Sequence, residues 1–180
     1  MRDHAAKWPV APNWETARLE TQALSIYVVI DLDQQLVGGN LGAWSAAAES
    51  DGIGAGAFAI AAGDPYCVRL ARDQLLWVGH SLAATTGGWC EEGYAATDVG
   101  AGLQVFEVSG PVAPSLMQRA TALDLAAVSS PSAAMLFAGV TAIVYRYRYT
   151  DTFRVHVDRA LATHVWTWFQ AIAPLLSSPA

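Results

Sequence analysis

The stretch from Leu103 to Ala173 constrains the fold of this chain more than any other. It opens with a β-branched and aromatic run that leads into Ser109-Gly-Pro111, and it closes with an amphipathic helical pattern from Arg159 to Ala173. Between these two, the apolar spacing changes to that of β-strands. Strands and helices that follow one another in this way predict an α+β fold, in which antiparallel sheets carry packed helices.

The other predicted elements are short and separated by Gly, Pro, Ser and Asp. A helix is expected at Leu41–Glu49, where alanine and tryptophan follow an asparagine. Two pairs of strands predict hairpins, one turning at residues 71–73 and one at residues 138–139. The predicted strands are Leu24–Leu32, Tyr66–Leu70, Gln74–Gly79, Tyr94–Val99, Leu103–Val108, Met135–Phe137, Val140–Tyr149 and Thr152–Val157.

Two helix starts have recognisable signals. Ser109 is expected to cap a helix that has Pro111 in its first turn and runs to about Ala120. Asp158 is expected to cap the last helix. In that helix the predicted buried stripe is Leu161, Val165, Trp168 and Ile172.

The pairing of the last two strands predicts where their arginines lie. A three-residue loop at 150–152 places Tyr149 opposite Phe153, with the tyrosines on one face. The same register places Arg148 beside Arg154 and Arg146 beside His156 on the other face. That face is either solvated or a small basic patch for a partner's carboxylate or an anionic ligand.

Residues 1–23 are predicted to form an extended arm before a single domain at residues 24–180, which can also be divided into halves at 24–93 and 94–176. The arm carries Trp8 and Trp14, which dock either on the chain's own domain or on a partner. Trp166 lies outside the predicted buried stripe and is either covered by a loop or an interface anchor. The six residues predicted to contact a partner are Trp8, Trp14, Arg146, Arg148, Arg154 and Trp166.

The composition favours a subunit of a complex. Apolar residues make up 53% of the chain and charged residues only 14%, which leaves little charge for a fully solvated surface. The net charge of −6 argues against nucleic-acid binding. The chain has two cysteines and shows neither an apolar leader nor a long apolar run. These features predict a soluble cytoplasmic protein that does not enter a membrane.

No catalytic, cofactor-binding or metal-ligating residue is predicted. Gly52-Ile-Gly54-Ala-Gly56 lacks the strand before it and the glycine spacing of a dinucleotide loop, so a flexible connection is favoured. His80 and Cys90 could form an imidazole–thiolate pair only if the fold placed them together, and no pattern predicts that. Zinc spacing and nucleophile motifs are missing from the sequence as well.

From about Cys67 to Ala173, an ordered set of segments resembles the gamma subunit of heterotetrameric sarcosine oxidase. The Ser109-Gly-Pro111 junction alone is also similar to the wider group of folate-binding aminomethyltransferase (glycine-cleavage T-protein) domains. The resembling segments are Val68–Gly79, Asp98–Val99, Val105–Pro111, Ala122–Leu125, Leu136–Val140, Thr152–Val155 and His164–Trp168.

The resemblance implies ferredoxin-like strand–helix units and a place in a complex with alpha-, beta- and delta-type subunits. It implies that the complex oxidises sarcosine to glycine with FAD, FMN and NAD held by the other subunits, and passes the one-carbon unit to tetrahydrofolate. The gamma chain would carry no flavin chemistry and no zinc. The non-polar Gly100-Ala-Gly102 connection and the first 60 residues depart from the family pattern. Two alternative functions therefore stay open. The chain could be a gamma-type subunit of a related N-methyl or secondary amine oxidase, or a stand-alone tetrahydrofolate-binding domain.

Overall fold

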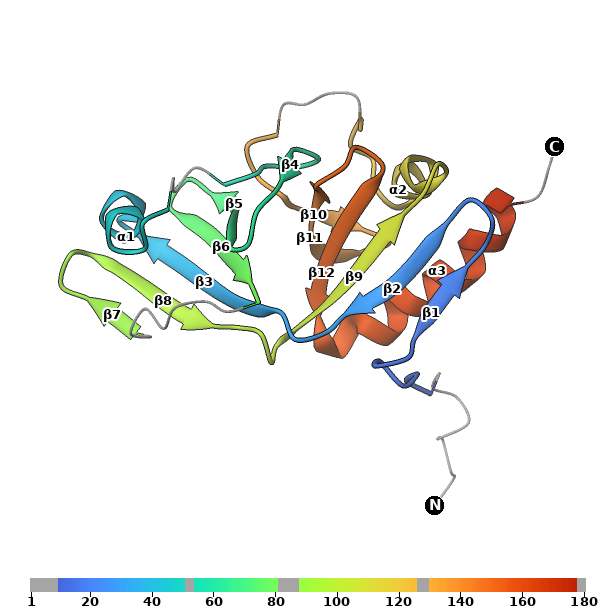
Figure 1. Cartoon of the computed structure of the whole chain (residues 1–180), viewed down its shortest axis with the longest axis horizontal. Coiled ribbons are helices and arrows are strands. Elements are labelled where there is room, and N and C mark those ends of the chain that lie inside the picture. The colour runs from blue at the N-terminus through green and yellow to red at the C-terminus, as the bar shows by residue number, and fades with distance from the viewer. Residues whose placement is uncertain (1–9, 51–53, 81–87, 126–129, 178–180) are drawn as a thin grey trace, which may run out of the picture.

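A computed structural model describes residues 10–50, 54–80, 88–125 and 130–177, and the described chain is built on two sheets (Figure 1). The larger sheet has seven strands in the order β1-β2-β9-β12-β11-β10, with the short β4 parallel to β11. All its other pairs are antiparallel. Its strands are β1 (Arg18–Glu20), β2 (Ser25–Val29), β4 (Ile60–Ala61), β9 (Leu103–Ser109), β10 (Ala134–Phe137), β11 (Val140–Tyr147) and β12 (Thr152–Asp158).

The smaller sheet has five strands in the antiparallel order β5-β6-β3-β8-β7. The larger sheet takes strands from both ends of the chain, because β1 and β2 precede the strands of the smaller sheet and β9 to β12 follow them. The strands of the smaller sheet are β3 (Asp33–Gly39), β5 (Tyr66–Ala71), β6 (Gln74–Gly79), β7 (Gly88–Cys90) and β8 (Tyr94–Asp98).

Three apolar cores hold the layers together. One face of the larger sheet packs against α2 (Ala113–Ala120) and α3 (Ala162–Ser177), which follows a 3₁₀ turn at Arg159–Leu161. The other face packs against the smaller sheet, whose far side is covered by α1 (Leu41–Ala47). The central strands of the larger sheet are therefore buried on both faces.

The α+β fold with antiparallel sheets and packed helices is confirmed. The helix predicted at Leu41–Glu49 is α1, and the side chain of Asn40 caps it by accepting the backbone N–H of Ala43 at 3.2 Å. The hairpins β5–β6 and β10–β11 are also confirmed. Strands β1, β3, β4 and β7 were not predicted, because they are short or carry Gln and Gly where apolar alternation is expected.

The predicted cap at Ser109 is wrong. Ser109 continues β9 and pairs with both Ser25 and Thr152. Gly110 then turns the chain with a φ of +117°, and α2 begins only at Ala113 without a side-chain cap. Asp158 does act as predicted, since its side chain accepts the backbone N–H of Ala160 at 2.8 Å at the start of the 3₁₀ turn.

The predicted register of the last hairpin is also wrong. Tyr145 lies opposite Arg154, so the tyrosines and Arg154 share one face. The prediction assumed that one face meets solvent, which would separate apolar from charged side chains. In the structure both faces of β12 are buried, with Phe153 towards the helices and Arg154 towards the smaller sheet. A polar residue facing the smaller sheet is satisfied there by hydrogen bonds.

The buried stripe of the last helix is rotated from the prediction. Val165 is buried as expected, but Leu161 is 39% exposed and Trp168 is only partly buried. Trp166 is 4% exposed, because it stacks on Phe106 of β9. The fully buried positions of α3 are Ala162, Val165, Trp166, Phe169 and Ala173.

The segment before β2 folds back on the chain. Trp14 packs edge-on against Phe106 and Trp166, with ring centroids 6.0 and 6.3 Å away. Leu19 of β1 packs against the same core. None of the helices in the described ranges is long and apolar enough to cross a membrane. The division into an arm at 1–23 and a domain at 24–180, or into halves, stays a prediction.

Candidate functional site

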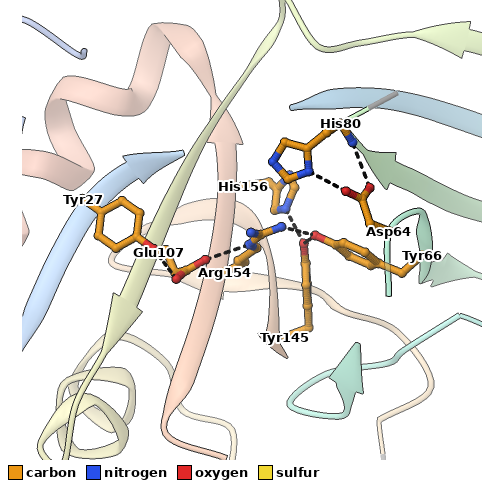
Figure 2. A network of polar contacts seen from close by, with 8 residues as sticks. All are labelled: Tyr27, Asp64, Tyr66, His80, Glu107, Tyr145, Arg154 and His156. Atoms are coloured by element: carbon orange, nitrogen blue, oxygen red, sulfur yellow. Dashed lines mark hydrogen bonds and ion pairs between the residues drawn. The ribbon is translucent and has the colours of Figure 1, made fainter. Parts of the chain in front are cut away.

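A chain of polar side chains runs through the space between the two sheets, and Arg154 of β12 stands at its centre (Figure 2). The Arg154 guanidinium donates through Nε to Glu107 of β9 at 3.1 Å and through Nη1 to the Tyr66 hydroxyl at 2.7 Å. Glu107 also accepts a short hydrogen bond from the Tyr27 hydroxyl. Arg154 is only 4% exposed, so this ion pair is shielded from water.

The hydrogen bonds continue in one direction from Tyr66. Its hydroxyl lies 2.7 Å from that of Tyr145, which lies 2.7 Å from Nε2 of His156. The other ring nitrogen, Nδ1, lies 2.6 Å from the side-chain oxygen of Gln34. Since a carbonyl oxygen only accepts, Nδ1 carries the His156 proton and Nε2 accepts from Tyr145. Tyr145 then accepts from Tyr66, which accepts from Arg154.

Burial shifts the pKa values of the histidine and the tyrosines of this network so that they stay neutral near pH 7. Burial, reinforced by the Arg154 charge, lowers the pKa of His156 to about 3. Burial raises the pKa of Tyr66 to about 12, and burial together with the hydrogen bond to Glu107 raises the pKa of Tyr27 to about 12. The pKa of Tyr145 is also raised, chiefly by burial. Within the polar network, the charged side chains are the ion-paired Arg154 and Glu107.

This polar network links the two sheets. It connects β2, β9, β12 and β11 of the larger sheet with β5 and β3 of the smaller one. Both nitrogens of His156 are engaged and the side chain is 1% exposed, so its imidazole cannot take a proton from a molecule outside. A cavity of about 290 Å³ opens beside Tyr27, Glu107 and Arg154, with His80 and Arg148 at its border.

Comparison with known proteins identifies the family. Residues 58–174 match the model of the sarcosine oxidase gamma subunit family. The chain belongs to this family. The match covers every strand of the polar network except β2 and β3.

The fold of this gamma-family chain is also found in solved structures. One is the heterotetrameric sarcosine oxidase from Corynebacterium sp. U-96 in complex with pyrrole 2-carboxylate, with a TM-score of 0.74 and 17% identity over 93% of this chain and 92% of that chain. A weaker similarity, with a TM-score of 0.44 and 14% identity over 86% of this chain and 45% of that one, is to the glycine cleavage system aminomethyltransferase T from Bartonella henselae. No curated protein matches the sequence.

The three arginines predicted to form a patch are separated by the fold of the gamma-family chain. Arg154 is buried, so its predicted outward position is wrong. Arg146 is partly buried and binds loops, donating to the backbone carbonyls of Thr150 at 3.0 Å, Leu125 at 3.1 Å and Phe58. Arg148 is exposed, and its guanidinium lies 4.9 Å from the centre of the Tyr147 ring.

The predicted interface tryptophans differ in their surroundings. Trp166 is buried inside the chain, so it offers no surface to a partner, contrary to the prediction. Trp14 stays partly exposed on the same aromatic cluster. Trp8 lies outside the described residues.

The pairing of His80 with Cys90 does not form. His80 Nδ1 lies 2.8 Å from a carboxylate oxygen of Asp64, and the thiol of Cys90 donates to Glu92 at 2.6 Å. Two hydrogen bonds from His80, one from its backbone and one from its ring, lower the pKa of Asp64. Within the described ranges no group of three or more His, Cys, Asp or Glu side chains could hold a metal ion.

Most residues of the polar network were missed by sequence reasoning. The sequence analysis assigns Tyr145, Arg154 and His156 to faces of a sheet, but it does not single out Tyr27, Gln34, Tyr66 or Glu107. The signal available was the alternation of Arg154 and His156 with Phe153, Val155 and Val157. That alternation predicts a strand with one face exposed to solvent. The sequence of the strand does not show that a second sheet covers its polar face.

Proposed function

We propose that this chain is a non-catalytic gamma-type subunit of a heteromeric, flavin-dependent sarcosine oxidase, which it stabilises and positions. The match of residues 58–174 to the gamma subunit family carries this proposal. The polar network supports it, because its ionisable groups join the two sheets and its histidine, His156, is closed to a substrate. The low content of charged residues, 14%, also suits a chain whose surface is covered by partners.

On this proposal the redox chemistry belongs to other subunits of alpha, beta and delta type. Those subunits hold FAD, FMN, NAD and tetrahydrofolate, and the assembled complex converts sarcosine to glycine in the cytoplasm. A related N-methyl or secondary amine is the alternative substrate, since the family match assigns the subunit type and leaves the amine open. Among the predicted interface residues, Trp14 and Arg148 keep exposed surface for these partners.

Affinity purification of the tagged chain from its native host tests the proposal. We expect it to bring down flavin-containing polypeptides, with flavin absorbance in the complex and sarcosine-dependent reduction of that flavin. The same chain expressed alone should be colourless and inactive. An isolated chain that binds flavin and oxidises sarcosine, or a native preparation without any flavoprotein, contradicts the proposal.

A stand-alone tetrahydrofolate-binding domain is the second candidate. The cavity beside Tyr27, Glu107 and Arg154 favours it, because a carboxylate in a half-buried slot is what a pterin ring requires. Its volume of about 290 Å³ is at the lower limit for small-molecule sites, and Arg154 is already paired with Glu107. Titrating tetrahydrofolate into the isolated chain should leave its Trp fluorescence unchanged under our first proposal. A saturable quench that Glu107→Gln abolishes would favour the second.

A further inference from the structure

The cavity of about 290 Å³ beside the polar network has a basic lining. Two guanidinium groups, those of Arg148 and Arg154, line it together with one carboxylate, that of Glu107. This local excess of positive charge occurs in a chain whose net charge is −6. A concave site lined mainly by charge of one sign attracts ligands of the opposite sign, so the lining favours an anion.

The carboxylates at and near this cavity are already engaged. One oxygen of Glu107 accepts from a tyrosine hydroxyl of β2, and the other accepts from Nε of Arg154 at 3.1 Å. Asp64 lies outside the lining, and its carboxylate accepts two hydrogen bonds from His80, at 2.9 and 2.8 Å. Among the described residues, the Arg148 guanidinium is therefore left without a carboxylate within ion-pair distance.

Arg154 offers the cavity a donor that is held in place (Figure 2). Its Nε and Nη1 donate to Glu107 and Tyr66, and its guanidinium carbon lies 3.5 Å from the centre of the Tyr147 ring. Nη2 donates to none of the described residues, so it is available to a ligand. Because these contacts fix the guanidinium, little side-chain freedom is lost when it binds one.

Arg148 places a second guanidinium at the border of the cavity. Its guanidinium carbon lies 4.9 Å from the centre of the same Tyr147 ring, and the residue is exposed. The backbone of Arg148 has a φ of +62°, a conformation that glycine or asparagine adopts at lower cost. The turn between β11 and β12 therefore does not require arginine here, which points to a role for the side chain.

The size and the walls of the cavity select a carboxylate among anions. A guanidinium binds a carboxylate through two parallel N–H···O hydrogen bonds. A phosphate carries up to two negative charges, so Glu107 would repel it more strongly than a monoanion. Tyr27, Tyr147 and Tyr149 also line the cavity, and tyrosine rings offer apolar surface to carbon atoms next to a carboxylate. A volume of about 290 Å³ suits a short aliphatic acid or the end of an acidic side chain.

We propose that this cavity binds the carboxylate group of a short aliphatic ligand, with Arg148 and Arg154 as the donors. The ligand is either a free monocarboxylic acid or an aspartate or glutamate side chain of another protein, since both present the same group. The inference does not depend on the proposed function, because every group that it uses belongs to this chain. It also differs from the pterin site considered above, which uses Glu107 as an acceptor.

An NMR titration of the ¹⁵N-labelled full chain with sodium propionate tests the site. Propionate has the carboxylate and the short aliphatic group of a glutamate side chain, and sodium chloride keeps the ionic strength constant because salt screens charges. We expect a saturable shift of the Arg154 Nε–H signal, and no such shift with the uncharged propionamide. An Arg154 signal that does not move, or that moves equally with propionamide, overturns the proposal.

Arg148→Gln tests the contribution of the second guanidinium without disturbing the buried ion pair. The matched control is Arg72→Gln, which removes the same charge at an exposed turn outside the cavity. We expect the Kd for propionate to rise about fivefold or more in Arg148→Gln, because a charge-assisted donor is lost. In the control it should change less than about twofold, since distant exposed charges are screened. Equal effects in the two variants overturn the proposal.

The complex purified from the native host separates the two sources of the carboxylate. If a partner's acidic side chain fills the cavity, the complex of Arg148→Gln should dissociate at lower salt than that of Arg72→Gln. Propionate binding by the isolated chain together with equal salt stability of the two complexes assigns the cavity to a free acid. A failed propionate titration overturns the inference whatever co-purifies, whereas the proposed function fails only if no flavoprotein does.

Discussion

At the level of single residues, the neutral His156 makes stability depend on pH. Its pKa is about 3 in the folded chain against 6.5 for an ordinary histidine, so folding excludes a proton that the unfolded chain binds. The sign follows from this lowering: the contribution is fully present above pH 6.5 and is lost as the pH falls towards 3. We expect the free energy of unfolding to decrease by up to about 1.4 kcal/mol per pH unit in this window. Urea unfolding followed by Trp fluorescence between pH 7 and pH 4 measures it.

His156→Gln isolates this effect from other acid-sensitive groups. The variant keeps the Asp64–His80 pair, whose own pH dependence then cancels in the comparison. It should be less stable than the wild type at pH 7, and the difference should shrink on acidification. A difference that stays constant across the window would show that His156 does not titrate in this way.

The buried Arg154–Glu107 pair should behave unlike the exposed Arg18–Glu20 pair, in which both side chains are 58% exposed. Arg154→Met leaves the Glu107 charge buried without compensation, so we expect a loss of about 3–5 kcal/mol in the free energy of unfolding. Arg18→Met serves as the matched control and should lose less than about 1 kcal/mol. Urea denaturation at pH 7 compares the two variants.

A double variant completes this test. Arg154→Met/Glu107→Gln removes both charges, and we expect it to be more stable than Arg154→Met alone because no carboxylate is then left unpaired. If the double variant is the less stable of the two, the loss in the single variant comes from packing and not from the unpaired charge.

At the level of helices and strands, Gly110 determines where β9 ends. Its φ is +117°, and a Cβ at this position would lie 2.5 Å from the backbone oxygen of Ala23. Gly110→Ala should therefore cost about 2 kcal/mol or more, because both the backbone and the packing are strained. Gly139→Ala is the control, since that glycine has a φ of +84° with open space around it, and it should cost only about 1 kcal/mol. Equal urea midpoints for the two variants would contradict a role for the contact with Ala23.

The sequence predicts the positions of helices and strands better than it predicts how they pack against one another. The hairpin β5–β6 and the helix α1 follow from local patterns and turn residues. The rotation of α3 does not, because Trp166 is buried by Trp14 and Phe106, which come from distant parts of the sequence. The register of β11 against β12 was missed for the same reason, since Tyr66 lies on the other sheet.

For the chain as a whole, the shared core between the sheets predicts one cooperative unfolding unit. Val68, Leu76 and Val78 of the smaller sheet pack with Val105 and Tyr145 of the larger one. The polar network crosses the same space, and the strands of each sheet are separated in sequence by those of the other. One sheet cannot unfold without exposing apolar surface of the other.

Hydrogen exchange at increasing urea concentrations tests this cooperativity. The amides of β6 and β9 lie in different sheets, and we expect their exchange free energies to converge on one value that equals the global free energy of unfolding. Strand β7, which pairs with β8 at the edge of the smaller sheet, serves as the internal control and should exchange at lower free energy. Separate limiting values for β6 and β9 would show that the two sheets are independent units. In that case the polar network would join two domains, and its loss in Arg154→Met would leave one of them folded.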